Sequence, residues 1–331
     1  MDLELLQRTL DDLGQPRFRA GQVWSWVARG SAGYDEMTNV PAALRAELAA
    51  RVPFSSLAVE REATSSDGTV KVLFRTADGR PLEAVLMRFK DGRRSVCVSS
   101  QSGCPLTCTF CATGRMTFGR NLTSSEILDQ VLHFRRVEPV DHVVFMGMGE
   151  PMMNLDAVLA ACDLLPDVGV TNRRTTVSTV GWLPGIEALT DQHRPVRLAL
   201  SLHAPEQELR SQIMAVNDRY PLADVLAACR RHHEVTGRTV YIEYVMLAGI
   251  NDSYAQARAL AELLGPGYAW KVNLIPYNPT GMYEGSSREA IAAFRAVLEE
   301  HGVPATTRLT RGRDIDAACG QLAVSAAETA A

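Results

Sequence analysis

The sequence predicts an α/β protein whose main part is a partial barrel of six parallel strands with helices outside. Three observations predict it. From residue 93 onward, apolar runs typical of buried strands alternate with amphipathic helical segments, the order that produces a parallel sheet. Paired Asp-Gly turns precede this region, and the first residues repeat apolar side chains at helical spacing. Six units are too few to close an eight-stranded barrel, so we expect a partial one.

Residues 1–57 predict a small helical domain. In the first helix apolar residues recur every three or four positions, and Gly14 follows as a stop signal. A second helix with the same spacing ends at Gly30. A third follows Asn39 and tolerates Pro41 in its first turn.

Residues 58–92 predict an antiparallel hairpin extension between the helical domain and the barrel. Short strand-like runs in this region are separated by Asp-Gly pairs, which are a strong signal for tight hairpin turns. The pairs are Asp67-Gly68, Asp78-Gly79 and Asp91-Gly92.

We expect residues 93–322 to form the barrel core and residues 323–331 to form a frayed tail. One helix of the core begins with the capping box Thr123–Glu126. In folds of this kind the chemistry lies at the C-terminal ends of the strands. The strand candidates are residues 95–99, 142–147, 175–179, 196–202, 239–246 and 271–276.

The composition is typical of a globular protein, and the chain has no net positive charge. Apolar residues make up 46% and charged residues 22% of the 331, and the net charge is −4. An RNA substrate would therefore depend on a local basic patch. The first residues lack the basic start and apolar run of a signal peptide. No stretch approaches the roughly 20 apolar residues of a membrane span, so we expect a cytoplasmic protein with no membrane partner.

Four of the seven cysteines lie within residues 97–111. The odd total argues against a static disulfide framework. Cys104, Cys108 and Cys111 form C-x3-C-x2-C in a loop directly after a strand. Thiolates bind soft metal centres, and one tight loop can present three of them to one iron–sulfur cluster. Because a cubane has four irons, three cysteines leave one iron open to a substrate or cofactor.

A structural zinc site is the alternative interpretation of these cysteines. Such sites close with four ligands and use paired Cys or His residues at short spacing. No second pair with that spacing accompanies the three cysteines, so the sequence favours the cluster.

Polar residues also follow several of the other predicted strands. Gly147, Gly149 and Glu150 come just after one strand, where glycine permits close approach of a ligand to the backbone and a carboxylate can accept from an ammonium group. Taken singly, each such residue is as consistent with an ordinary turn or cap. The others are Ser178, Ser201, His203 and Asn278.

The cysteine loop resembles that of the radical S-adenosylmethionine (SAM) superfamily, including aromatic Phe110 before the last cysteine. This resemblance implies a radical SAM type partial barrel, with a [4Fe-4S] cluster held by Cys104, Cys108 and Cys111. It also implies SAM on the open iron as the source of a 5′-deoxyadenosyl radical. The residues that would bind SAM are Gly149, Glu150, Ser178, Ser201, Leu202, His203 and Asn278.

The whole chain resembles the 23S rRNA adenine C2-methyltransferases that also modify tRNA. The matching segments extend from the N-terminal domain to the tail. They are FRAGQVW, DEMTN, CVSSQSGCPLTCTFCATG, RNLTSSEI, MGMGEP, STVG, SLHAP, IEYVML, NLIPYNP and TRGRDIDAACGQL.

This family resemblance implies roles for two further cysteines. One SAM methylates the cysteine that matches Cys319, and a second SAM, on the cluster, activates that methyl group, so two are used per turnover. The activated carbon joins the adenine and links protein to RNA. The cysteine that matches Cys97 then attacks the sulfur, forms a disulfide with Cys319 and frees the methylated base. Cys162 and Cys229 lie on helical patterns and are interpreted as small buried hydrophobic residues.

The resemblance also implies a proton acceptor and partners. Glu83 is the candidate base for the ring proton, with a solvated strand carboxylate as the alternative. The expected partners are 23S rRNA, tRNA, and an electron donor such as flavodoxin or ferredoxin, with the enzyme itself a monomer. The helical domain resembles the family's RNA-recognition domain. The basic clusters that could contact phosphate are Arg88, Lys90, Arg93 and Arg94, and Arg308, Arg311 and Arg313.

Three alternative functions remain open at this point. The nearest is methylation of C8 of the same adenine, which shares most of these motifs. A radical activase of another protein is a second, although Cys97 and Cys319 would then have no role. A cluster-bearing RNA-binding protein without enzymatic activity is the third, and SAM cleavage by the reduced protein would exclude it.

Overall fold

The computed structural model describes residues 1–323, and its centre is one open sheet of ten strands. The six expected parallel strands are all present and adjacent in chain order. They are β4 (Arg94–Cys97), β7 (His142–Phe145), β8 (Thr175–Thr179), β9 (Arg197–Ser201), β10 (Val240–Met246) and β11 (Trp270–Pro276). The predicted fold class is confirmed. A seventh parallel strand, β12 (Ala305–Thr307), extends the sheet beyond β11.

Amphipathic helices connect these strands, as the alternating pattern predicts. The expected capping box is present, because Thr123 Oγ1 accepts from Glu126 N and the Glu126 carboxylate accepts from Thr123 N. The helices are α4 (Ser124–Arg135), α5 (Leu155–Leu164), α6 (Leu183–Asp191), α7 (Gln207–Ile213), α8 (Val216–Arg219), α9 (Leu222–Thr236), α10 (Tyr254–Leu264) and α11 (Arg288–Glu300). No helix in the described part of the chain is long and apolar enough to cross a bilayer.

The antiparallel strands continue the same sheet. β1 (Leu57–Thr64), β2 (Val70–Thr76) and β3 (Pro81–Arg88) form a meander. β3 then pairs with β4 in antiparallel register, with Val85 opposite Cys97. The hairpin therefore covers an edge of the parallel sheet that would otherwise expose unpaired backbone groups. Two short strands, β5 (Gln101–Ser102) and β6 (Arg120–Asn121), bracket the cysteine loop.

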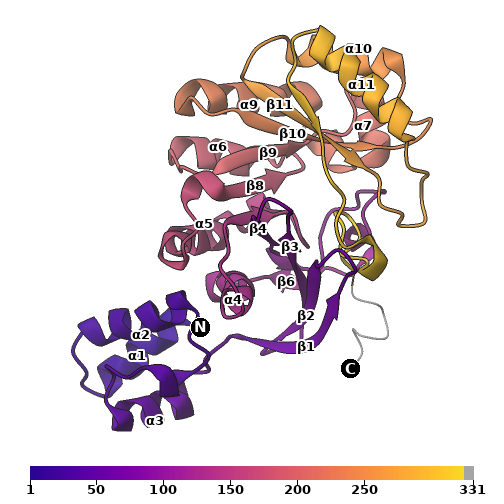
Figure 1. The fold of residues 1–331 in the computed structure, drawn as a ribbon. Helices are drawn as coiled ribbons and strands as arrows, with labels where there is room; N and C mark the ends of the chain where they lie inside the picture. The colour runs from indigo at the N-terminus through magenta and orange to yellow at the C-terminus, as the bar shows by residue number, and fades with distance from the viewer. Residues whose placement is uncertain (324–331) are drawn as a thin grey trace.

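The N-terminal helices form a separate group at one end of the molecule (Figure 1). They are α1 (Leu3–Asp12), α2 (Phe18–Arg29) and α3 (Ala42–Arg51). Asp129 of α4 connects this group to the core, because its carboxylate pairs with the Met1 ammonium group and accepts from Ser56 N and Oγ. Trp24 Nε1 donates to Asp167 Oδ2 at 2.7 Å as a second connection.

The C-terminal segment after β12 crosses back beside the hairpin (Figure 1). Asp314 accepts from Ser65 Oγ and Ser66 N, and Gly312 N donates to Asp67 Oδ2 at 3.1 Å. The expected frayed tail lies outside the described residues apart from Ala323. The segment thus joins the two ends of the open sheet without a strand of its own.

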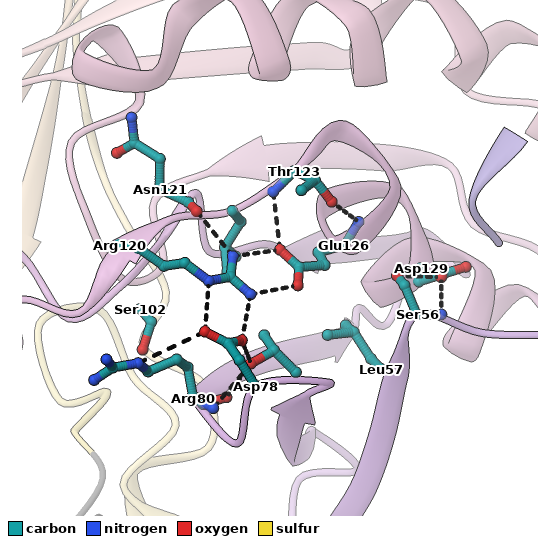
Figure 2. Close-up of polar contacts among 12 residues, drawn as sticks. Ser56, Leu57, Asp78, Arg80, Ser102, Arg120, Asn121, Thr123, Glu126 and Asp129 are labelled. Atoms are coloured by element: carbon teal, nitrogen blue, oxygen red, sulfur yellow. Dashed lines mark hydrogen bonds and ion pairs between the residues drawn. The ribbon is translucent and has the colours of Figure 1, made fainter. Parts of the chain in front are cut away.

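Arg120 joins the hairpin to the start of α4 (Figure 2). Its guanidinium donates to Glu126 Oε1 and Oε2 at 2.7 and 2.8 Å, and to Asp78 Oδ1 and Oδ2 at 2.6 and 3.0 Å. Glu126 is nearly buried, with 7% of its side chain exposed, whereas half of the Asp78 side chain is exposed.

Replacement of Arg120 by Ala should lower the free energy of unfolding by about 1–2 kcal/mol, because it leaves a nearly buried carboxylate without its cation. Asp78→Asn should cost less, since solvent screens the exposed half of the network. Urea denaturation followed by circular dichroism measures both. Equal unfolding midpoints for the two variants would contradict this ranking.

Candidate active site

The three clustered cysteines line one cavity at the C-terminal ends of the parallel strands. They lie between β5 and β6, in the loop that follows β4. Cys108 is buried, and Cys104 and Cys111 are half-buried. The Phe110 ring packs edge-on against His203, with 4.6 Å between the ring centroids. The structure thus brings together the thiols that the spacing predicts.

The donor set fits a metal cluster better than a single ion. Burial raises the pKa of Cys104 to about 12, and the pKa of Cys108 is raised by burial and by its cysteine neighbours. A bound cationic centre would reverse this penalty and hold the three as thiolates. Among the described residues, no three His, Cys, Asp or Glu side chains converge on one ion position. Three thiolates from one loop are a donor set that iron–sulfur clusters use, whereas a closed structural zinc site needs four ligands.

Glu150 forms part of the cavity wall beside the cysteines. Its carboxylate accepts from Met152 N at 3.0 Å and from Val180 N at 2.9 Å. Burial raises the pKa of Glu150 to about 7. Gly149 before it has a φ of +94°, and a Cβ there would lie 2.5 Å from the Gln101 side chain. The glycine therefore permits the turn that places the carboxylate.

The polar residues at or just after the C-terminal ends of β8, β9 and β11 reach the same cavity. Ser178, Ser201, His203 and Asn278 all line it. His203 Nδ1 accepts from Val245 N at 3.0 Å, which leaves the proton on Nε2. Burial lowers the pKa of His203 to about 3, so its imidazole is neutral at physiological pH. Leu202, in contrast, is fully buried in the core and does not line the described cavity, because side chains alternate along an extended segment.

Cys319 lies in the wall of a second, adjoining cavity as well as the first. Cys97 lines the second cavity, together with Arg308. Burial raises the pKa of Cys97 to about 12, with Cys319 adding to the rise and Arg308 opposing it. Both are free thiols, so the disulfide expected from the family is not formed in this structure. Two cysteines far apart in the sequence are thus neighbours in space.

The Cys319 segment is held in place by the cysteine loop and by the end of β11. Asn278 Nδ2 donates to Cys319 O at 3.1 Å, and Ala112 N donates to Gly320 O at 2.8 Å. Thr113 Oγ1 donates to Leu322 O. These contacts fix the position of Cys319 in the wall of the first cavity.

Glu83 lies on β3 with 2% of its surface exposed, so its interpretation as a solvated carboxylate is wrong. It forms an ion pair with Lys71 Nζ at 3.1 Å and accepts from Ala323 N at 3.1 Å. It lines neither described cavity, but Leu322, the neighbour of its backbone donor, lines both.

Cys162 and Cys229 are buried on α5 and α9, as their helical patterns predict. Sequence reasoning gave no role to Glu243, which lines the first cavity from the middle of β10. The sequence feature that could have indicated it is a charged residue within the otherwise mainly apolar strand Val240–Met246.

Two family models match the chain. Residues 98–261 match the radical SAM superfamily, and residues 1–53 match the ribosomal RNA large subunit methyltransferase N-terminal domain. The fold and the cysteine cavity agree with the first match, which defines a radical SAM enzyme. Membership of this superfamily implies SAM and a [4Fe-4S] cluster.

Full-length relatives define the class further. A dual-specificity RNA methyltransferase RlmN of Alkalilimnicola ehrlichii is 44% identical, with 97% of this chain and 92% of the relative covered. A relative from Symbiobacterium thermophilum is 45% identical over 97% of this chain and 90% of its own. The crystal structure of a radical SAM methyltransferase from Sphaerobacter thermophilus is 44% identical, has a TM-score of 0.90 and covers 97% of each chain. The chain belongs to the RlmN family of radical SAM RNA methyltransferases, which confirms the recognition made from its motifs.

Anaerobically reconstituted protein should bind about four irons, because three thiols match the open cubane site. Replacing Cys104, Cys108 or Cys111 by Ala should abolish both iron binding and SAM cleavage. The matched control is Cys162→Ala, which removes a buried thiol away from the cavity and should retain the iron. Iron analysis and the visible absorption spectrum measure the result, and full cleavage of SAM by Cys108→Ala would contradict the assignment.

Proposed function

We propose that this enzyme methylates C2 of an adenine in 23S rRNA, and of an adenine in tRNA, through an S-methylated Cys319 and a transient protein–RNA link. One observation carries the proposal. Cys319 lies in the wall shared by two cavities, with the cluster cysteines around one and Cys97 in the other. A group attached to its sulfur is therefore accessible from both.

The first cavity would bind the cofactors. Cys104, Cys108 and Cys111 would hold the [4Fe-4S] cluster, and Glu150 would accept from the methionyl ammonium group of SAM. The neutral His203 presents an Nε2–H donor to the same space. When bound, the cluster and SAM supply a 5′-deoxyadenosyl radical. The other candidate contacts for SAM are Gly149, Ser178, Ser201 and Asn278.

A cysteine-borne carbon suits the chemistry of the target. C2 of adenine is an electron-poor amidine carbon and cannot simply attack a sulfonium methyl group. Cys319 would first take a methyl group from one SAM, and a second SAM would be used in its activation. The carbon then joins the ring, which links Cys319 to RNA.

Cys97 would resolve the link. Its sulfur loses its proton and attacks the sulfur of Cys319, and the bond from the Cys319 sulfur to the new carbon breaks with its electron pair left on that carbon. The carbon takes up a proton, so the base leaves with a methyl group. The two cysteines become a disulfide, which two electrons return to thiols in a reducing compartment such as the cytoplasm. Glu83 is the candidate acceptor for the ring proton, and Lys71 stabilises its charged form at 3.1 Å. A flavodoxin or ferredoxin would supply electrons to the monomeric enzyme.

RNA would approach over the tip of the β3–β4 hairpin. Phe89 lies there between two guanidinium groups, with Arg93 Cζ at 4.1 Å and Arg311 Cζ at 5.4 Å from the ring centroid. Arg311 also lines the second cavity. One arginine from each basic cluster of the sequence therefore contacts the same ring, and Arg311 connects this ring to the cavity that Cys97 and Cys319 line. Such a surface suits bases and phosphates.

Other members of these clusters are used inside the protein. Arg88 and Arg94 both pair with Glu138. Arg313 Nη2 donates to Tyr277 O and Asn278 Oδ1, each at 3.3 Å. These residues would orient the surface. Arg93 and Arg311 lie 3.7 Å from Asp91 and Asp67, and they would exchange these carboxylates for RNA phosphates. The helical domain that matches the family's N-terminal model would contribute further RNA recognition.

Variants of Cys319 and Cys97 should fail at different steps of the reaction. Wild-type enzyme should convert an rRNA fragment to 2-methyladenosine, identified by mass spectrometry against 2-methyl and 8-methyl standards. Cys319→Ala should give no product and no adduct, because nothing carries the methyl group. Cys97→Ala should give no product but accumulate a protein–RNA species that survives denaturing electrophoresis.

A purely structural role for these cysteines would weaken all steps alike and would not produce this asymmetry. Absence of a crosslink in both variants, with normal product from Cys97→Ala, would overturn the two-cysteine mechanism. Formation of 8-methyladenosine would instead assign C8 as the target.

Phe89→Ala should weaken RNA binding roughly tenfold, because a stacking platform contributes about 1–3 kcal/mol per base. Iron content and SAM cleavage without RNA should be unchanged. Tyr268→Ala is the matched control, since this exposed aromatic residue lies before β11, at the opposite end of the strands. Fluorescence anisotropy with a labelled rRNA hairpin measures affinity, and equal affinity of the two variants would exclude Phe89 from the interface.

A further inference from the structure

Glu243 is a buried carboxylate to which neither the family motifs nor the proposed cofactor contacts give a role. It lies on β10 with 4% of its surface exposed and lines the cavity shared with Cys319. Oε1 accepts from Asn273 Nδ2 at 2.9 Å. Oε2 has no hydrogen-bond partner among the described residues, and Arg308 Nη1 lies 3.8 Å away. A buried carboxylate oxygen without a hydrogen bond costs free energy, so its presence here requires a functional explanation.

The orientation of this carboxylate is fixed by three adjacent strands. Glu243 on β10 pairs in register with Asn273 on β11, and Asn273 pairs with Thr306 on β12. Their side chains repeat this order, because Thr306 Oγ1 donates to Asn273 Oδ1 at 2.7 Å and Asn273 donates to Glu243. The amide can therefore present only its NH₂ group to Oε1, which leaves Oε2 as the oxygen of this cavity-lining residue that has no hydrogen bond among the described residues.

Cys319 needs a proton acceptor if it is to take a methyl group. A thiolate, not a thiol, is the effective nucleophile. Burial raises the pKa of Cys319, with Arg308 opposing the rise and Glu243 and Cys111 adding to it. Burial likewise raises the pKa of Glu243, which is the direction that makes a carboxylate a better base. Arg308 lines the second cavity together with Cys319, and its Nη1 lies 3.8 Å from Glu243 Oε2.

We propose that Glu243 accepts the Cys319 proton when this thiol is methylated, an inference that rests on the proposed function of Cys319. The S–H bond breaks and the proton passes to Oε2. The sulfur electron pair forms the new S–CH₃ bond, and the bond from the methyl carbon to the sulfonium of SAM breaks to release neutral S-adenosylhomocysteine. Charge balances, because a carboxylate and a sulfonium become a carboxylic acid and a thioether. Arg308 acts as a positioning residue that holds the charged carboxylate beside the thiol.

The test measures methyl transfer to Cys319 under conditions in which no radical can form. Reconstituted holoenzyme with unmethylated Cys319 is mixed with methyl-labelled SAM without an electron donor, and the Cys319 peptide is analysed by mass spectrometry. Glu243→Gln should slow incorporation about 100-fold or more, the usual contribution of a general base. Glu243→Asp should recover part of the rate. Cleavage of SAM by the dithionite-reduced variant should keep the wild-type rate.

The outcomes separate the inference from the proposed function. Normal methylation by Glu243→Gln would overturn the role of Glu243. Parallel loss of methylation and SAM cleavage would also overturn it, because Glu243 would then bind or support the cofactor. Wild-type protein that never carries a methyl group on Cys319 would overturn the proposed function itself.

Discussion

The return of the C-terminal segment across the open sheet is the constraint on which the rest of the site depends. The segment has little regular structure, so its backbone groups must find partners elsewhere. They find them in the hairpin turn at Asp67, the cysteine loop at Ala112, and Asn278 after β11. These separate contacts place Cys319 at the meeting point of two cavities. Without them, Cys319 would belong to a different part of the molecule from Cys97 and the cluster cysteines.

Burial of reactive groups is the main source of the site's chemistry. Thiols and carboxylates in the cavity walls lose solvation, and the pKa values of Cys97, Glu150 and Glu243 are all raised for this reason. Arg308 is a cation that interacts with Cys97, Cys319 and Glu243 and favours the charged form of each. A site arranged in this way keeps its nucleophiles protonated until a bound group or a neighbouring base changes the balance.

Continuity of the sheet links substrate recognition to the reaction. The hairpin is the antiparallel edge of the same sheet that carries the parallel core, so the position of Phe89 relative to Cys97 is set by the β3–β4 register. Arg120 and Glu138 strengthen this connection from two sides. The proposed RNA surface is therefore a rigid extension of the catalytic core.

The sequence by itself determined the elements that depend on local pattern. Alternating apolar runs predicted the six parallel strands, Asp-Gly pairs predicted the hairpins, and cysteine spacing predicted a single metal-binding loop, because each is encoded within a few residues. Only the tertiary structure decided that Glu83 is buried, that Arg88 and Arg94 are used internally, and that Glu243 and Cys319 line one cavity. These facts depend on groups 44 to 240 residues apart in the chain, such as Arg94 with Glu138 or Glu83 with Ala323. No local pattern specifies such pairings, because packing of distant segments selects them.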